Sequence, residues 1–409
     1  MRNRRRLERF CGVVSFFLAC VPISQANRFQ DHPSSVSNSR AEAASAFARG
    51  QQALQTGDLT TADTSFRKVL SIDPQAAPAY ANLGVIAMRR QQWDQALTLL
   101  QKAEKLDPKM SGIRLNIALV KYRREDYVGA IPPLESVLRD QPNSAQARYL
   151  LGLCQLYTEH YPEAAVTLEP LWASSSNDIM YLYALSVAAH RAGKKELDER
   201  AMSRLIEIGS DTPEFHLILG KAYLNRGESE QAIAQLQKAD SANPNLPYVH
   251  FGLGIAYMKN DNNDAAESEL KKEIALEPNL PDAYEQLGEL YLKMNRYENA
   301  EQALRHALKL NSQMPASLFG LAKINMQRDH YQQALTEIDS ALKLAPGSQT
   351  VHFVRGRILL KLGRHDEAEK ELMISKNMLD AAAAKESLEP SSMDDNRIRN
   401  PELSGAAPQ

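Results

Sequence analysis

Apolar and small residues recur along the chain with a period of 34 residues, without an insertion or deletion between residues 43 and 382. Within each period they follow helical spacing in two stretches of about a dozen residues, joined by a turn such as Thr56-Gly57-Asp58. The pattern predicts ten helical hairpins. Their units start at Ala43, Ala77, Ser111, Ala145, Ile179, Pro213, Pro247, Pro281, Pro315 and Gln349.

Four positions of the repeat indicate how the two helices of a unit pack. The eighth is always Gly, Ala or Ser, and the twentieth is alanine in nine units, with Asp198 as the exception. Small residues at two fixed sites let antiparallel helices cross closely. The twenty-fourth is always apolar, and the thirty-second is proline in six units, where it ends the second helix.

These positions resemble the tetratricopeptide repeat family. The stretch Tyr80-Ala81-Asn82-Leu83-Gly84 with Ala96, Leu100, Ala103 and Pro108 carries the resemblance, as does Leu219-Gly220-Lys221-Ala222-Tyr223 with Ala232, Ala239 and Pro244. The resemblance covers 340 of 409 residues. It implies an all-α fold, a right-handed α-solenoid of helix-turn-helix repeats, that acts as a protein-protein interaction scaffold.

The N-terminus predicts export. Basic residues are followed by an apolar run from Phe10 to Ile23 and by Ser24-Gln25-Ala26, as in a signal peptide, residues 1–26, that is cleaved after Ala26. The run is shorter than the roughly 20 residues of a spanning helix, so we expect no transmembrane span. A second interpretation is lipidation at Cys20, because Phe16-Phe17-Leu18-Ala19-Cys20 resembles a bacterial lipobox. Under either interpretation the chain is exported: periplasmic, secreted or an outer-membrane lipoprotein.

The segments around the array are polar, and its ends differ from its interior. Residues 27–42 read as a polar linker and 383–409 as a disordered tail. At the seventh position interior units carry Leu or Ile, whereas the terminal units carry Arg49 and Arg355. We therefore expect polar caps and a complete array. Units four and five depart from the pattern at 172–177 and 208–211, either through drift or as a flexible joint.

Composition excludes several classes of function. Hydrophobic content of 44% and charged content of 24% fit a soluble, folded chain. The leader carries five Arg and one Glu, so its removal changes the net charge from −2 to −6. A mildly acidic chain without a basic block argues against a nucleic-acid partner. Cys11 and Cys20 lie in the leader, so Cys154 alone would remain, and we expect it to be buried and inert.

No motif in the sequence nominates a reaction. Glycine-rich phosphate loops, zinc-binding helix motifs, paired CxxC and serine-elbow motifs are all lacking. His216, His250 and His352 share the fourth position of their units, where a large residue packs between helices. We therefore expect no catalytic residues, no metal and no cofactor.

The resemblance implies a binding groove, because in the family the first helix of each unit lines the concave wall. The corresponding residues include Leu115, Leu119, Tyr122, Tyr149, Leu153, Tyr183 and Val187 in units three to five. Units six to ten contribute Lys221, Phe251, Phe319, Lys323, Phe353 and Arg357. A partner peptide or helix is expected to bind there. The alternatives are that the apolar members pack against neighbouring helices and that the basic members are simply solvated.

Overall fold

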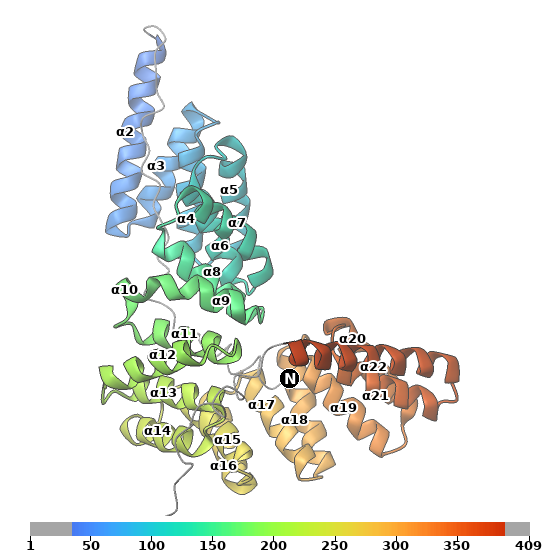
Figure 1. Ribbon diagram of the computed structural model, residues 1–409. Coiled ribbons are helices and arrows are strands. Elements are labelled where there is room, and N and C mark those ends of the chain that lie inside the picture. The colour runs from blue at the N-terminus through green and yellow to red at the C-terminus, as the bar shows by residue number, and fades with distance from the viewer. Residues whose placement is uncertain (1–34, 389–409) are drawn as a thin grey trace, which may run out of the picture. The chain divides into compact units, whose positions relative to one another are not determined.

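Every secondary-structure element that the structure describes is a helix. The computed structural model describes residues 35–388, and the side-chain surroundings of 39–381. This part of the chain contains helices and turns and no strand (Figure 1). The all-α helix-turn-helix fold is thus confirmed. The expected signal peptide, 1–26, and Cys20 lie outside the described residues.

Two helices alternate along the chain in each repeat. The first helices are α2 (Ser35–Thr56), α4 (Ala77–Arg89), α6 (Ser111–Arg123), α8 (Ala145–Tyr157), α11 (Ile179–Arg191), α13 (Pro213–Arg226), α15 (Val249–Lys259), α17 (Pro281–Lys293), α19 (Pro315–Gln327) and α21 (Gln349–Lys361). The second helices are α3 (Leu59–Ile72), α5 (Trp93–Leu106), α7 (Tyr127–Asp140), α9 (Tyr161–Leu168), α12 (Lys195–Ile208), α14 (Ser229–Ala242), α16 (Asn263–Leu276), α18 (Tyr297–Leu310), α20 (Tyr331–Leu344) and α22 (His365–Leu388).

The repeat phase and the helix boundaries differ at three places. Helix α2 begins at Ser35, so the last part of the expected linker, 35–42, is helical. Helix α22 runs to Leu388, so the first part of the expected tail, 383–388, is helical too. Helix α15 begins at Val249 rather than Pro247, after Tyr248 in a left-handed conformation with φ of 73°. The other first helices begin where a unit starts.

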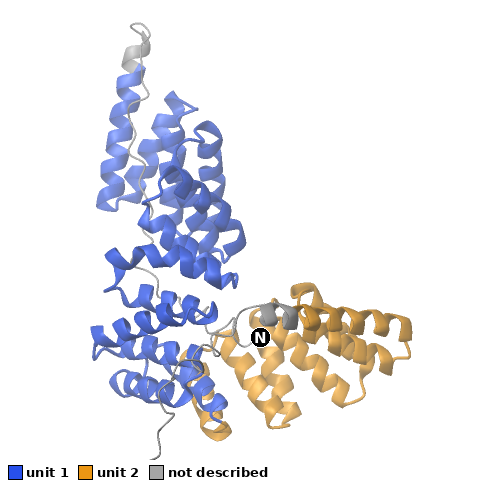
Figure 2. Cartoon of the chain, in the orientation of Figure 1, with its two compact units in different colours: residues 1–260 blue, residues 261–409 orange. Residues whose placement is uncertain are grey.

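The chain divides into two compact units, 1–260 and 261–409 (Figure 2). The division falls between α15 and α16, not in the irregular stretch of units four and five. In the first unit, one hydrophobic cluster runs from Ala81 on α4 to Ala222 on α13. In the second, another cluster joins α19, α20, α21 and α22. Packing is therefore continuous through units four and five.

Glycine at the eighth position lets the two helices of a hairpin cross closely. A Cβ atom on Gly84 would lie 2.7 Å from Cγ of Leu100, and one on Gly220 would lie 2.6 Å from Cγ of Leu236. Such distances are well inside van der Waals contact. The small residue thus accommodates the apolar side chain from the twenty-fourth position of the same unit.

The turn inside every hairpin contains one left-handed residue, at the fifteenth position of the unit. Glycine fills this position in four units, at Gly57, Gly193, Gly227 and Gly363. The other units use Gln91, Glu125, Glu159, Asp261, Asn295 and Asp329, with φ between 56° and 64°. Glycine adopts this conformation without steric conflict, whereas a residue with a Cβ atom loses about 1–2 kcal/mol. Six turns therefore hold strain.

The second helix of unit four is broken into three pieces. Helix α9 ends at Leu168 and is followed by a 3-10 turn, η1 (Glu169–Leu171), and the short α10 (Trp172–Ser175). Pro170 lies in the turn, and its ring lacks the N–H that a continuous helix needs. The guanidinium of Arg200 lies 3.8 Å from the ring centroid of Trp172, so α12 holds α10 in place.

Units five and six pack in a different way from their neighbours. Helix α12 has little contact with α13, and α11 packs on α13 instead. Helix α12 ends at Ile208 and is followed by Gly209 as its C-cap, with a φ of 46°. Near this junction Asp198, which departs from the repeat in unit five, pairs with polar side chains of units five and six. The Ser186 hydroxyl donates to Asp198 Oδ1 at 2.7 Å, and Arg226 Nη1 donates to Asp198 Oδ2 at 2.5 Å.

Arg355 does not act as a polar cap, which corrects the expectation for the last unit. Its Nε donates to Asp339 at 2.6 Å and its Nη1 donates to Glu371 at 2.8 Å. His352 Nδ1 lies 2.6 Å from the second oxygen of Glu371. Arg355 thus joins α21 to α20 and α22, because it lies on the inner side of the hairpin. Arg49 in the first unit is exposed, as expected for a cap.

Candidate functional site

The expected groove residues of units three to five are buried. Leu115, Leu119, Tyr122, Tyr149, Leu153, Tyr183 and Val187 all belong to the hydrophobic cluster of the first compact unit. Successive first helices contact one another directly, α6 with α8 and α8 with α11. Side chains at these positions therefore fill the space between helices, which favours the packing interpretation over an open wall.

Lys221 and Phe251, the next expected groove residues, are also buried. The ammonium of Lys221 lies 5.3 Å from the ring centroid of Tyr183, within the range of a cation-π contact. Asn225 Nδ2 donates to the Tyr183 hydroxyl at 3.0 Å, one helical turn from Lys221. These three side chains connect α11 to α13 in the interior of the first compact unit.

Exposed members of the expected groove remain in units nine and ten. Phe319 is half-buried, and Lys323, Phe353 and Arg357 are exposed, with Phe353 at 42%. Phe319 and Lys323 occupy the fifth and ninth positions of their unit on α19, and Phe353 and Arg357 occupy the same positions on α21. We call these four residues the aromatic-basic surface.

The charges of this surface point to its chemistry. The guanidinium of Arg357 lies 5.9 Å from the ring centroid of Phe353. Neither Lys323 nor Arg357 has an ion pair among the described side chains. An aromatic ring beside an arginine is a common anchor in protein interfaces, because both bury large areas. The surface therefore suits a partner segment with apolar and acidic side chains.

Histidines and the cysteine have structural surroundings. His216 lies 2.8 Å from Gln235 Oε1, and His250 lies 3.1 Å from the carbonyl oxygen of Pro244, each through a ring nitrogen. Burial, together with the nearby charge of Asp126, raises the pKa of the Cys154 thiol well above its ordinary value. This cysteine therefore stays protonated and unreactive at neutral pH.

The described residues contain neither a metal-binding cluster nor a membrane-spanning helix. Among the described residues, no three His, Cys, Asp or Glu side chains are grouped so that they could hold a metal ion. No described helix is both long enough and apolar enough to cross a membrane.

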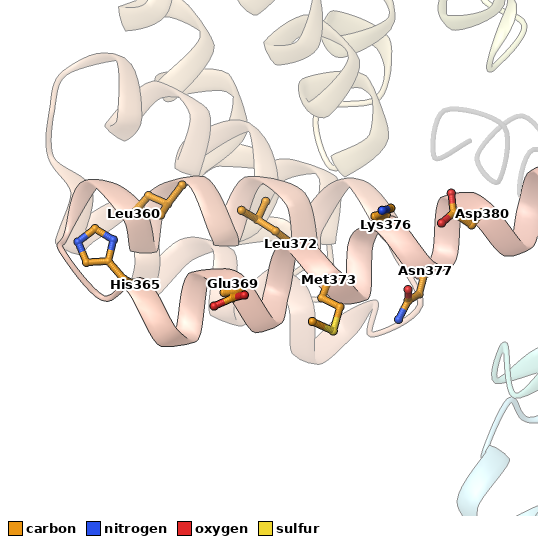
Figure 3. Close-up of a pocket in the computed structure, with 8 residues that line it drawn as sticks. All are labelled: Leu360, His365, Glu369, Leu372, Met373, Lys376, Asn377 and Asp380. Atoms are coloured by element: carbon orange, nitrogen blue, oxygen red, sulfur yellow. The ribbon is translucent and has the colours of Figure 1, made fainter.

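An open groove of about 620 Å³, which the sequence did not predict, runs along the last described helix (Figure 3). We call it the α22 groove. It is lined by Leu360, His365, Glu369, Leu372, Met373, Lys376, Asn377 and Asp380. Leu360 and Met373 are 43% and 56% exposed, and both line this groove. The signal in the sequence was an apolar pair, Met373 and Ile374, in the helix that ends the array.

Sequence profiles of three families match the chain. The profile described as the cilia and flagella-associated protein 70 C-terminal domain matches residues 178–390, more than half of the chain. Two profiles described as tetratricopeptide repeat match residues 53–116 and 115–176. No curated protein shows a significant match.

Several solved structures are similar to the chain. The crystal structure of MamA is 23% identical, with a TM-score of 0.37 over 41% of this chain and 97% of its own. That of yeast Tom70 is 15% identical, with a TM-score of 0.43 over 85% and 95%. A tetratricopeptide repeat protein from Parabacteroides merdae is 16% identical, with a TM-score of 0.48 over 61% and 98%. These similarities carry no conclusion about partners or activity.

Proposed function

The chain belongs to the tetratricopeptide repeat family, with more than half of it matching the C-terminal domain of cilia and flagella-associated protein 70, and on this premise we propose that it is an exported binding scaffold without an active site of its own. Proteins of this family generally mediate protein-protein interactions. The finer proposal is that this chain works in the cell envelope and binds an extended or helical segment of a partner protein.

The observation that carries the binding proposal is the exposure of Phe353 beside Arg357. The same fifth and ninth positions carry Phe319 and Lys323 one unit earlier, so an aromatic ring and a cation repeat along the array. A partner segment that lies across α19 and α21 would meet two similar pairs. Recognition by equivalent positions of successive repeats is the usual way in which solenoids bind extended ligands.

The experiment is affinity capture of envelope proteins by the full chain, compared with the variant Lys323→Glu/Arg357→Glu. We expect the variant to lose its main captured proteins, because the reversal repels an acidic segment. The matched control is Lys309→Glu/Lys343→Glu, which makes the same charge change at exposed positions of α18 and α20. Equal capture by the two double variants would contradict the proposed surface.

Support for export comes from residues 1–26, whose basic start, apolar run and small residues have the composition of a signal peptide. Mass spectrometry of the chain recovered from the envelope fraction tests it. An N-terminus at Asn27 is expected, and an intact Met1 in the cytoplasmic fraction would contradict the proposal.

The second candidate is a lipid-anchored outer-membrane assembly factor, which the lipobox-like sequence before Cys20 favours. In that case palmitate label would appear in the wild type and disappear in Cys20→Ser. An unlabelled wild type would leave the unanchored scaffold as the proposal.

A further inference from the structure

The α22 groove has charges that find no partner within the described residues. Glu369, Lys376 and Asp380 are exposed and make no ion pair with another described side chain. Other charges of the same helix are paired, since Glu367 accepts from Arg364 at 2.6 Å and Glu371 accepts from Arg355 at 2.8 Å. The helix therefore has satisfied charges on one side and unpaired charges together with the exposed Met373 on the other.

Six of the seven α22 residues that line the groove are arranged symmetrically, and Asn377 is the exception because its counterpart would be the buried Ala368. His365, Glu369, Leu372, Met373, Lys376 and Asp380 follow one another at intervals of four, three, one, three and four residues. These intervals keep all six on one side of an α-helix, as Figure 3 shows for the labelled side chains. The midpoint lies between Leu372 and Met373. Residues at equal distances from it have complementary character: the two apolar side chains, then Glu369 and Lys376, then His365 and Asp380.

We propose that the α22 groove is a homodimer interface, in which α22 of one chain lies antiparallel to α22 of a second copy. A two-fold axis between Leu372 and Met373 places each residue opposite its counterpart on the partner. Met373 then covers the outer edge of the partner's Leu372, a half-buried residue whose Cγ packs on Gly356 inside its own hairpin, and Glu369 meets the partner's Lys376. His365 meets the partner's Asp380 at both ends. Leu360 of α21 flanks the contact, where its exposed side chain is covered.

The charge pattern selects a second copy in this orientation over other occupants. A parallel pairing would set Glu369 against Glu369 and Lys376 against Lys376, which is repulsive. A neutral apolar peptide would cover Met373 but leave both charges without partners. The contact is one helix face about 22 Å long, at a rise of about 1.5 Å per residue. Because this is small for a stable interface, we expect a Kd on the order of micromolar.

The test is sedimentation velocity on the full chain from about 1 to about 200 μM, a range that brackets the expected Kd. The wild type should pass from monomer to dimer. Glu369→Lys alone and Lys376→Glu alone should each raise the dimer Kd about tenfold, because by symmetry each turns two attractive contacts into repulsive ones. Lys370→Glu is the matched control. It makes the same charge change on the same helix, outside the groove, and should dimerise like the wild type.

The weakening by each single variant is specific for antiparallel pairing, and two further samples test whether residues 369 and 376 act as a charge pair across the interface. An equimolar mixture of the two single variants should form a heterodimer with the wild-type Kd, because each charge again faces its opposite. The double variant Glu369→Lys/Lys376→Glu should also dimerise like the wild type. A monomeric wild type at the highest concentration would overturn the proposal. Dimerisation that the single variants do not weaken, or a mixture that stays monomeric, would overturn it as well. Circular dichroism of each variant verifies that the helices are intact.

Discussion

Asp198 is a polar residue at the twentieth position of unit five, where the other units have a small residue. Replacing it by alanine tests what its carboxylate contributes to stability. Asp198 is 4% exposed, and three side chains contact its carboxylate: Ser186 at 2.7 Å, His190 at 3.1 Å and Arg226 at 2.5 Å. Alanine at this position is what the other nine units have. A comparison with the repeat consensus alone would therefore predict stabilisation.

The structure predicts the opposite sign. Removal of the carboxylate leaves the buried Ser186 hydroxyl without its acceptor, which costs about 1–3 kcal/mol. Arg226 still pairs with Glu228 at 2.6 Å and is partly solvated. The loss of its ion pair with Asp198 therefore adds only about 0–1 kcal/mol. We expect Asp198→Ala to lower the free energy of opening of α11 and α12 by about 1–4 kcal/mol.

The double variant Ser186→Ala/Asp198→Ala supplies the control. It reproduces the alanine pair that units three and nine have at Ala118 with Ala130 and Ala322 with Ala334. Because both polar partners are then gone, its stability should lie within about 1 kcal/mol of the wild type. Native-state hydrogen exchange of α11 and α12 measures these differences locally. An Asp198→Ala variant as stable as the wild type would refute the reasoning, as would a double variant less stable than the single one.

The same carboxylate predicts a dependence on pH. Burial alone would raise the pKa of Asp198, but hydrogen bonds from His190 and Ser186 and the charge of Arg226 outweigh it and lower the pKa below its ordinary value. A lowered folded-state pKa means that the stabilisation is complete above the unfolded pKa of about 3.9. It is lost as the pH falls from there through the folded pKa. The stability difference between wild type and Asp198→Ala should therefore shrink below about pH 4.

Three further predictions concern the turns, the last unit and the buried tyrosines. Gln91→Gly should stabilise unit two by about 1 kcal/mol, because glycine removes the strain of the left-handed conformation. Gln92→Gly is the control and should not stabilise the unit, because Gln92 has a φ of −87°. Urea unfolding compares the two variants. Arg355→Ala should lower the free energy of unfolding by about 1–3 kcal/mol, since the half-buried Glu371 loses its arginine partner and keeps only His352, and a thermal melt unchanged from the wild type would contradict this. Tyr149→Ala/Tyr183→Ala should melt earlier by circular dichroism and lose binding only in proportion to unfolding, and weaker capture with an unchanged melt would show that both rings contact the partner.

The sequence predicted the helices well because their signals are local. Gly84 against Leu100, and proline near the end of a second helix, recur in phase and define both ends of a hairpin. Accessibility of the groove was not predictable in this way. Tyr149, Tyr183 and Phe353 share the fifth position, yet the first two are buried and the third is 42% exposed. The difference comes from neighbours, since α21 has a preceding first helix but no following one within the described residues.

The sequence also could not predict contacts between side chains that come from different helices. Ser186 fitted the small eighth position and Asp198 was the exception at the twentieth, and their hydrogen bond became visible only when the two helices were placed side by side. Arg355 looked like a cap because its position in unit ten was compared with apolar positions in other units. Its carboxylate partners come from two other helices, at positions that the repeat does not constrain.

The distribution of glycine turns has a consequence for shortening or extending the array. The four glycines are in units one, five, six and ten. Units one and ten are the two ends of the described array. Units five and six are the pair between which α12 and α13 make only a weak contact. Apart from unit seven, which the division into two compact units splits between Asn260 and Asp261, the units with strained turns have firmer packing on both sides. In a solenoid, neighbours supply much of the energy that keeps a unit closed. A chain cut after unit nine would therefore end on the strained turn at Asp329, and its new last hairpin would fray unless that residue also became glycine.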